Sequence, residues 1–355
     1  MITISLCMIV KNEEKVLDRC LNSVKDFTDE IIIVDTGSTD DTKKIATKYT
    51  NKIYDFKWDD NFSKARNFSF SKATKDYQMW LDADDIVTDE NIAKIIKLKN
   101  TLDKNIDIVT FKYNTNFDIY NNPILTSTRE RLFKSKTKYL WIDPVHEYIQ
   151  LNGNILNSDI CIDHKKESNY TDRNLKIYEN LIKKNIQLSP RGLYYFAREL
   201  KDNNRYIEAI KYFNDFLDTN LGWVEDNISA CYSLAICYKL IKDNNKILDS
   251  LFKSFTYDSP RAEIICEIGY YYLNNNEYIK AKNWFNISIN LEKPDTIGFI
   301  LNDYYTFIPH IELAVCYYNL NDIPNSIKHN NIAGSFKPNS DIFLNNKKIL
   351  SELNY

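Results

Sequence analysis

The sequence predicts a mostly parallel α/β domain followed by an all-α domain built of helical repeats. Three observations support this prediction. Strand and helix patterns alternate four times in about the first 85 residues, polar clusters follow the strands, and from about residue 171 helical periodicity takes over. Alternation of this kind favours a doubly wound parallel sheet. The 355 residues have the length of about two domains, and we expect these to cover residues 1–168 and 169–355.

Apolar, β-branched segments mark the expected strands, and apolar residues at a 3.6-residue period mark the expected helices. Asn12 follows the first strand as a natural N-cap, and Glu13 and Glu14 suit the positive end of the helix expected there. The expected strands cover residues 2–10, 31–34, 52–56 and 77–81, with helical faces within 16–24, 45–49 and 62–75 and a helix over 88–102. Later strands are expected over 106–114, around Pro123 and over 129–133.

Composition and charge exclude several classes of protein. The formal net charge is −3 at pH 7, so no basic field indicates nucleic acid and no basic tract indicates an anionic membrane. The apolar N-terminus is too short for a membrane span and has no basic region before it, which favours a strand over a signal peptide. The seven cysteines form no C-x-x-C pair, and their apolar contexts are typical of reduced core thiols in a cytoplasmic protein.

The densest polar cluster is Asp82, Asp84 and Asp85, directly after a buried strand. Carboxylates packed this closely beside a core are costly unless a positive charge compensates them. A divalent cation with phosphate oxygens would do so, because hard cations prefer oxygen ligands and use only one or two carboxylates with substrate phosphates. An Asp-rich helix start is the plainer explanation, since Asp favours N-caps and first turns.

Polar clusters also follow two other expected strands, at residues 11–13 and 35–38. In doubly wound sheets, ligands bind outside the carboxyl ends of the strands. Three separate loops would therefore carry polar groups to one crevice. Caps and turns alone also favour Asn, Asp, Ser and Thr at such places, so a purely structural origin stays open.

Four segments of the first half form a set: residues 4–14 (ISLCMIVKNEE), 33–40 (IVDTGSTD), 65–67 (ARN) and 81–84 (LDAD). In order, spacing and context they resemble the nucleotide-sugar domain of inverting family 2 glycosyltransferases, which has the Rossmann-like GT-A fold. The resemblance covers about the first 165 residues. The most similar branch couples this domain to tetratricopeptide-like helices. It includes peptide S-glycosyltransferases of the sublancin type and flagellin glycosyltransferases, and it is similar to β-1,4-glucosyltransferases of lipopolysaccharide core synthesis.

The resemblance implies a role for each matching position on the donor side. Val10, Asn12 and Glu13 would line the nucleoside pocket. Asp35 would bind the uracil or the ribose. Arg66 would reach the base or the pyrophosphate, where its guanidinium could make a bidentate contact. A surface arginine on an amphipathic helix would look the same in sequence.

The same resemblance assigns the D-x-D segment to the phosphates. Asp82 would hold the ribose or a metal-bound water, Ala83 would lie in the nucleotide site between the two carboxylates, and Asp84 would ligate Mn²⁺ or Mg²⁺ bridging the two phosphates. A metal there would neutralise the charge that develops on the leaving diphosphate.

An inverting transfer needs a base that takes the acceptor proton during the attack. The family places a Val-His-Glu segment of the kind present here near the reaction centre. Glu147 is the first candidate for the base, with Asp143 and Glu130 as alternatives. His146 could complete the metal shell or be an ordinary structural histidine, and His164 is a second candidate ligand. The sequence leaves the choice between these histidines open.

The second half shows self-similarity. A small residue recurs, with a large residue three positions later and further packing positions twelve and sixteen positions later. This pattern resembles tetratricopeptide units of about 34 residues, in which the small residue lets a second helix approach closely. Most of the many tyrosines are expected to pack between helices, and some could line a concave peptide-binding or dimer surface. The recurring small residues are Ala197, Ala235, Gly269 and Ala314. Twelve positions after them come Ala209, Ile247, Ala281 and Ser326, and sixteen positions after them come Phe213, Leu251, Phe285 and Asn330.

These features together predict a metal-dependent inverting glycosyltransferase. The donor would be a UDP-sugar, UDP-glucose or UDP-N-acetylglucosamine, and the acceptor a Ser, Thr or Cys side chain of a peptide or protein. The helical half would hold the acceptor, form a homodimer, or both. One alternative is a cell-surface glycan or lipid-linked saccharide as acceptor. Another is a non-catalytic repeat scaffold with an inactive transferase domain.

Overall fold

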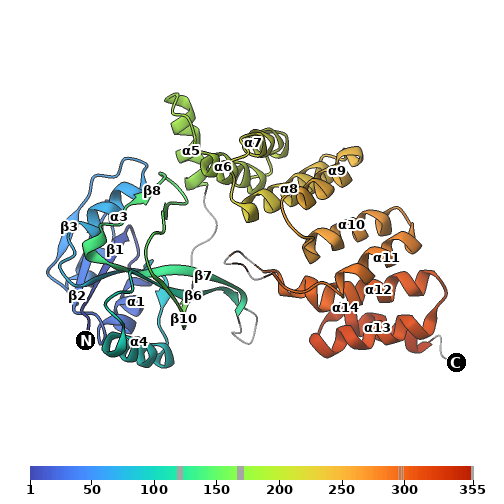
Figure 1. Cartoon of the computed structure of the whole chain (residues 1–355), viewed down its shortest axis with the longest axis horizontal. Helices are drawn as coiled ribbons and strands as arrows, with labels where there is room; N and C mark the ends of the chain where they lie inside the picture. Colours follow the sequence, from blue (N-terminus) through green and yellow to red (C-terminus); the bar gives the residue numbers. More distant parts are fainter. Residues whose placement is uncertain (118–122, 166–171, 295, 297, 299, 353–355) are drawn as a thin grey trace. The chain divides into compact units, whose positions relative to one another are not determined.

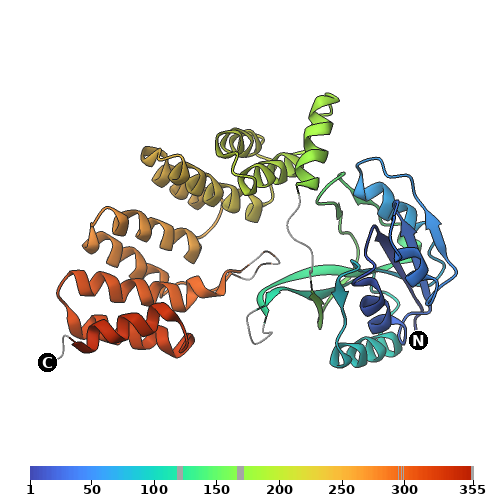
Figure 2. The same cartoon turned by 180° about the vertical axis from the view of Figure 1, so that it is seen from behind.

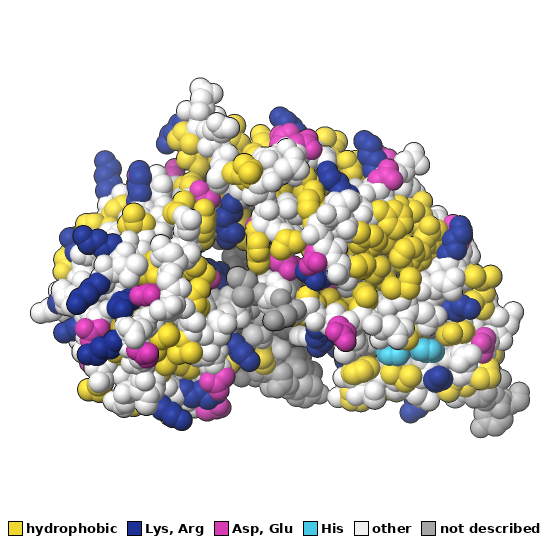
Figure 3. Space-filling view, viewed as in Figure 1, with side chains coloured by type: hydrophobic (Ala, Val, Ile, Leu, Met, Phe, Trp, Pro, Cys, Tyr) yellow, Lys and Arg dark blue, Asp and Glu magenta, His cyan; other side chains and the backbone are white. Residues whose placement is uncertain are grey.

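The computed structural model describes residues 1–117, 123–165, 172–294, 296, 298 and 300–352. It divides into two compact units, the first of which is Met1–Gly192 and the second of which begins at Leu193. The predicted boundary between residues 168 and 169 lies outside the described residues. On the face shown in Figure 3, basic and acidic side chains are interspersed, as the nearly balanced charge suggests.

The N-terminal unit is built on an eight-stranded sheet with the order β3-β2-β1-β4-β7-β6-β10-β5 (Figure 1). β1, β2, β3 and β4 pair in parallel, and β7 and β5 pair with their neighbours in antiparallel fashion. The predicted α/β class is therefore confirmed. The strands are β1 Ile4–Val10, β2 Glu30–Asp35, β3 Ile53–Asp55, β4 Tyr77–Trp80, β5 Asp85–Ile86, β6 Ile108–Phe117, β7 Pro123–Lys134 and β10 Ile155–His164, with a separate ribbon of β8 Trp141–Ile142 and β9 Tyr148–Ile149.

The sheet is covered on both faces, as buried parallel strands require. One core cluster joins β1 and β2 to the apolar side chains of α1 and α4, and a second joins the opposite face to α3 and the β8–β9 ribbon. These contacts explain the near-continuous apolar runs of β1, β2 and β4. The helices of this unit are α1 Leu17–Val24, α2 Thr42–Ala46, α3 Phe62–Phe70, α4 Asp89–Thr101, the 3₁₀ turn η1 Ser135–Thr137, and α5 Arg173–Lys183.

Register brings the carboxyl ends of three parallel strands together. Val10 at the end of β1 lies opposite Asp35 at the end of β2, and Cys7 of β1 lies opposite Trp80 at the end of β4. The segments that follow these strands therefore start at one edge of the sheet. This edge is where doubly wound sheets place their ligands.

The second unit is a stack of helix pairs (Figure 2). α10 packs on α11, α12 on α13 and α7 on α8, as tetratricopeptide-like repeats would, so the predicted all-α class is confirmed. None of the described helices in the chain is both long and apolar enough to cross a membrane. The helices are α6 Pro190–Asp202, α7 Tyr206–Asp218, α8 Val224–Leu240, η2 Asn244–Lys246, α9 Ile247–Lys253, η3 Ser254–Thr256, α10 Ala262–Asn274, α11 Tyr278–Ser288, η4 Asn302–Tyr305, α12 Phe307–Asn319, α13 Ile323–Phe336 and α14 Asp341–Glu352.

The small residues of the repeat pattern allow close helix approach. A Cβ atom added to Gly269 of α10 would lie 2.8 Å from the ring of Phe285 of α11. In the next pair, the hydroxyl of Ser326 in α13, twelve positions after Ala314, donates to the Ala314 carbonyl of α12 at 2.8 Å. The predicted twelve- and sixteen-residue relations are therefore direct contacts between paired helices.

We expect Gly269→Ala to lower the free energy of unfolding by about 1–3 kcal/mol, the usual cost of overpacking a core. The penalty comes from the Phe285 ring, which must move away from the new methyl group. Urea unfolding would measure it. Gly269→Ala combined with Phe285→Leu should lose less stability than the two single changes added together, and full additivity would contradict the contact.

Two histidines of the helical unit share a hydrogen bond. Nδ1 of His310 and Nδ1 of His329 are 3.0 Å apart. Burial lowers the pKa of both imidazoles, and the neighbouring His310 and Lys328 help to lower that of His329 to about 4. Both rings therefore stay neutral in the folded chain at pH values where an unfolded histidine is protonated.

This pair predicts a pH-dependent loss of stability. Below a pH of about 6.5 the unfolded chain binds more protons at these histidines than the folded chain does, so their contribution to stability falls as pH falls toward about 4. Melting temperatures at pH 7 and pH 5 would measure it. Wild type should lose more stability over this interval than His329→Gln does. Equal losses of stability in wild type and His329→Gln would contradict the lowered pKa of His329.

Candidate functional site

The loops after β1 and β2 are fastened to each other. The Asn12 side chain accepts from the backbone N of Thr39 at 2.8 Å, and the backbone N of Asn12 donates to the Ser38 hydroxyl at 2.9 Å. The prediction that Asn12 caps the following helix is wrong, because α1 begins at Leu17. Asn12 has a left-handed backbone with φ of 55°, a conformation that Asn tolerates. The residue therefore shapes the loop at the sheet edge.

Asp35 and Val10 form the base of this edge. The carbonyl of Val10 accepts from the backbone N of Thr36 at 3.0 Å. Oδ1 of Asp35 accepts from the backbone N of Gly37 and of Ser38, both at 2.9 Å. Asp35 is 1% exposed, and its Oδ2 has no hydrogen-bond partner within the described parts of the chain. A buried acceptor without a donor suits a ligand hydroxyl or N–H group.

The carboxylates of three predicted site residues, Glu13, Asp82 and Asp84, lie close enough to influence one another's pKa. Burial raises the pKa of Glu13 to about 7, with the negative charges of Asp84 and Asp82 adding to the rise. Burial also raises the pKa of Asp84, helped by the charges of Asp82 and Asp85 and opposed by His164. Excess negative charge at this edge would favour binding of a cation.

Arg66 supplies one cation to the cluster. Its Nη2 donates to Oδ1 of Asp82 at 2.8 Å, and its Nε donates to Oε1 of Glu147 at 2.5 Å. The guanidinium lies 4.7 Å from the ring centre of Trp80 and 4.9 Å from that of Trp141. Burial alone would raise the pKa of Asp82, but Arg66 and then Arg131 lower it. Arg66 is thus a buried partner of two candidate site residues rather than a surface arginine.

A possible metal donor set lies beside this ion pair. Ligand atoms of Asp84, Asp85 and His164 all fall within 4.8 Å of one another, and this is the one such group among the described residues. Nδ1 of His164 is 3.3 Å from Oδ1 of Asp84. Carboxylate and imidazole ligands suit a divalent metal such as Mn²⁺. The donor chemistry therefore fits the predicted metal, with His164 in the group. His146 is not in it.

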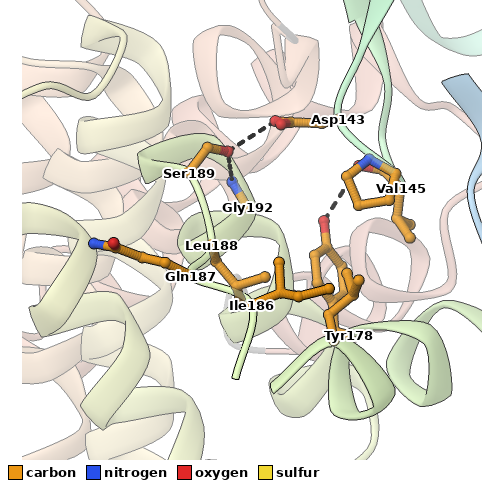
Figure 4. A pocket seen from close by; sticks show the side chains of 10 residues that line it. Asp143, Val145, Tyr178, Ile186, Gln187, Leu188, Ser189 and Gly192 are labelled. Atoms are coloured by element: carbon orange, nitrogen blue, oxygen red, sulfur yellow. Dashed lines mark hydrogen bonds between the residues drawn. The ribbon is translucent and has the colours of Figure 1, made fainter. Parts of the chain in front are cut away.

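The segment that carries His146 and Glu147 is held by the end of the N-terminal unit (Figure 4). The Ser189 hydroxyl donates to Oδ2 of Asp143 at 2.8 Å, and the Tyr178 hydroxyl donates to the Val145 carbonyl at 3.3 Å. Asp143 and His146 both have left-handed backbones, with φ of 70° and 52°. Non-glycine residues in this conformation often mark functional segments. A cavity of about 60 Å³ is lined by this segment, by α5 and by the residues that follow α5.

The candidate bases are placed differently. Glu147 is in contact with the cluster through Arg66, whereas Asp143 is bonded to Ser189. Glu130 lies on β7 opposite Thr110 of β6, and its carbonyl accepts from the Trp80 indole at 2.6 Å. Ala83 is buried between Asp82 and Asp84. Among the candidate bases Glu147, Asp143 and Glu130, the Glu147 carboxylate is the one with a hydrogen bond to Arg66, which also binds Asp82.

Sequence reasoning missed Arg131 and Tyr113 as members of the site, and it placed Asp85 in the acidic cluster without assigning it a role. Arg131 is fully buried, with its guanidinium 3.8 Å from the Trp80 ring centre. Arg129 lies over the same ring at 5.4 Å. The two arginines are two positions apart on a strand and therefore share a face, a signal that could have suggested a cation beside the D-x-D segment.

Residues 5–155 match the family model described as Glycosyl transferase family 2. These residues hold the segments that place Asn12, Asp35, Arg66, Asp84 and Glu147.

Curated relatives match parts of the chain. The "SPbeta prophage-derived glycosyltransferase SunS" of Bacillus subtilis is 30% identical over 260 residues, which is 69% of this chain and 60% of that protein. The chain thus spans less than two thirds of that relative. A "TPR repeat-containing protein" of Synechococcus elongatus is 51% identical over 85 residues, 24% of this chain and 21% of that protein.

One solved structure among those similar to the chain is glucosyl-3-phosphoglycerate synthase from Mycobacterium tuberculosis, determined in complex with Mn²⁺, uridine diphosphate and phosphoglyceric acid. It is 18% identical, covering 38% of this chain and 56% of that one, with a TM-score of 0.31.

Proposed function

The chain contains a domain of glycosyl transferase family 2 over residues 5–155, and we propose that it is a metal-dependent inverting glycosyltransferase. It transfers a hexose or N-acetylhexosamine from a UDP-sugar, UDP-glucose or UDP-N-acetylglucosamine, to a Ser, Thr or Cys side chain of a peptide or protein. The observation that carries the proposal is the convergence of Glu13, Asp82, Asp84, Arg66 and Glu147 at one edge of the sheet.

The nucleoside would bind between the loops after β1 and β2. The free Oδ2 of Asp35 accepts a hydrogen bond from uracil N–H or a ribose hydroxyl. Val10, Asn12 and Glu13 form the neighbouring wall, because Asn12 donates a hydrogen bond to Ser38 and accepts one from Thr39, and these bonds hold the two loops together. A prearranged acceptor in a buried position supports recognition of a specific polar group.

The diphosphate would bind at the D-x-D segment. Asp84 and His164 provide the metal donors, Asp82 is the carboxylate beside them, and Mn²⁺ or Mg²⁺ bound there would stabilise the charge on the departing diphosphate. Arg66 holds Asp82 and presents a guanidinium beside the same edge. The rings of Trp80 and Trp141 contact each other and both lie against the Arg66 guanidinium, which restricts its movement and favours a preorganised site.

Glu147 would act on the acceptor. Oε1 accepts from Arg66 Nε, so we assign proton transfer to the second oxygen, Oε2. The bonds from Ser189 to Asp143 and from Tyr178 to Val145 hold the segment that carries Glu147. A base held in this way can take the acceptor proton as the nucleophile attacks the anomeric carbon from the face opposite the diphosphate. The repeat unit would bind the acceptor or pair two copies of the chain.

A donor screen tests the proposal. The purified chain is incubated with a panel of nucleotide sugars and Mn²⁺, and release of the nucleotide by slow hydrolysis is measured. Release from one UDP-sugar, lost on addition of a chelator, supports the transferase and identifies its donor. The labelled donor is then offered to peptides containing Ser, Thr and Cys and to lipid-linked saccharides. Labelling of the saccharides alone would contradict the proposed acceptor, and lack of any UDP binding would favour the scaffold.

A further inference from the structure

Asp85 lies at the centre of a buried network directly after the D-x-D segment. Its Oδ1 accepts from the Tyr113 hydroxyl at 2.9 Å and faces Nδ1 of His164 at 3.1 Å. Its Oδ2 accepts from the backbone N of Asp82 at 3.0 Å and lies 3.2 Å from Nη1 of Arg131. A carboxylate offers about four lone-pair sites. These four neighbours therefore occupy all of the acceptor capacity of Asp85.

This saturation separates the role of Asp85 from that of Asp84. Asp85 is wholly buried and could bind a cation only by releasing one of its four neighbours, whereas the Asp84 side chain is 21% exposed. We propose that Asp85 is a positioning residue that orients the ring of His164 and the turn carrying Asp84, and that it is not itself a metal ligand. The proposal rests on the function proposed above.

Nδ1 of His164 lies 3.1 Å from Oδ1 of Asp85 and 3.3 Å from Oδ1 of Asp84, which leaves Nε2 as the ring nitrogen that His164 can offer to a metal. An imidazole whose Nδ1–H donates to a carboxylate has its lone pair on Nε2, and metal-binding histidines commonly have an outer partner of this kind. The backbone adds to the constraint. His164 of β10 is the ladder partner of Asp85 of β5, and the backbone N of Lys165 donates to the Asp84 carbonyl at 2.9 Å. Asp85 therefore links the two proposed ligands.

Arg131 and Tyr113 hold Asp85 in turn. The Arg131 guanidinium is fully buried and lies 3.8 Å from the ring centre of Trp80 and 4.4 Å from that of Tyr113. Its Nη1 also donates to the Trp80 carbonyl at 3.2 Å. A buried carboxylate without a cation is strongly destabilised, so the ion pair with Arg131 stabilises Asp85 in this buried position. Tyr113 contributes both its hydroxyl and its ring.

Tyr113→Phe tests this network with the smallest change, because it removes one donor to Asp85 and keeps the ring that packs on Arg131. We expect the Kd for Mn²⁺, measured by calorimetry in the presence of UDP, to rise about 10-fold, the lower end of the loss typical for an outer partner of a metal ligand. Asp85→Asn should raise it by up to about 100-fold. At saturating Mn²⁺, Tyr113→Phe should retain UDP binding within about twofold, since its change does not reach the nucleoside wall.

Tyr77→Phe is the matched control. Tyr77 of β4 is buried, as Tyr113 is, and its hydroxyl donates to the Ile106 carbonyl at 2.6 Å. The control variant therefore also loses one tyrosine hydrogen bond, but one that does not involve Asp85. Its Kd for Mn²⁺ should equal that of wild type. Equal Mn²⁺ affinity in Tyr113→Phe and Tyr77→Phe would show a merely structural network and overturn the positioning role alone. Failure of wild type to bind Mn²⁺ with UDP would overturn the proposed function as well.

Discussion

Asp84→Ala is expected to lower Mn²⁺-dependent release of the nucleotide from the donor by at least ~100-fold, the scale on which removal of a transition-state stabilising group acts. The variant removes the more exposed carboxylate of the group formed with Asp85 and His164. Asp85 cannot take its place, because its oxygens are occupied by four neighbours. The diphosphate would therefore leave without a neutralising charge.

Donor hydrolysis by the variant, with and without added Mn²⁺, measures this effect. Asp159→Ala is the control, because Asp159 is an exposed carboxylate whose side chain is paired with Lys94. Removal of an exposed partner of this kind has little effect on stability and should leave hydrolysis unchanged. Turnover by Asp84→Ala at the wild-type rate would show that Asp84 is not the metal ligand.

Arg66→Met is expected to lower the free energy of unfolding by about 3–5 kcal/mol, the cost of breaking a buried ion pair by removing one partner. The methionine fills much of the space that Arg66 occupies beside the Trp80 and Trp141 rings but leaves Asp82 and Glu147 without their shared cation. Donor turnover should fall by about 100-fold as well, because the site loses its preorganised charge. Urea unfolding and donor hydrolysis measure the two effects.

Arg66→Lys separates charge from geometry. Lysine restores a positive charge but cannot contact Asp82 and Glu147 with one planar fork, so stability should recover more than turnover does. Arg205→Met is the surface control, since Arg205 pairs with Glu208 at the solvent-exposed start of α7 and the variant should change stability by only about 1 kcal/mol or less. If Arg66→Met cost no more than Arg205→Met, the buried ion pair would not be a structural element of the site.

Much of the fold could be predicted because buried strands and paired helices leave a periodic trace in the sequence. β1 and β2 are buried on both faces and appear as near-continuous apolar runs. Gly269 and Phe285 obey a spacing that reflects a direct helix contact. The start of α1 was predicted wrongly because Asn12 satisfies capping rules equally well in a loop, where its side chain bonds to Thr39.

The candidate site was predictable only in part. Asp82, Asp84 and Arg66 belong to short local patterns at strand ends and on the following helix. Asp85, Tyr113 and Arg131 come together through pairing of β5, β6, β7 and β10, and no local pattern encodes that pairing. For the same reason, no local pattern could decide between His146 and His164 as the metal ligand. His164 reaches Asp84 because β10 pairs with β5, a contact across about 80 residues of sequence.

Titration of the chain with UDP by calorimetry, in the presence of Mn²⁺ and after its removal by a chelator, tests the central claim most directly. The account predicts binding that depends on Mn²⁺, is weakened in Asp84→Ala and is unaffected in Asp159→Ala. Absence of UDP binding in the presence of Mn²⁺, or binding of equal strength with the chelator present, would contradict the assignment of this edge of the sheet as a metal-dependent UDP-sugar site.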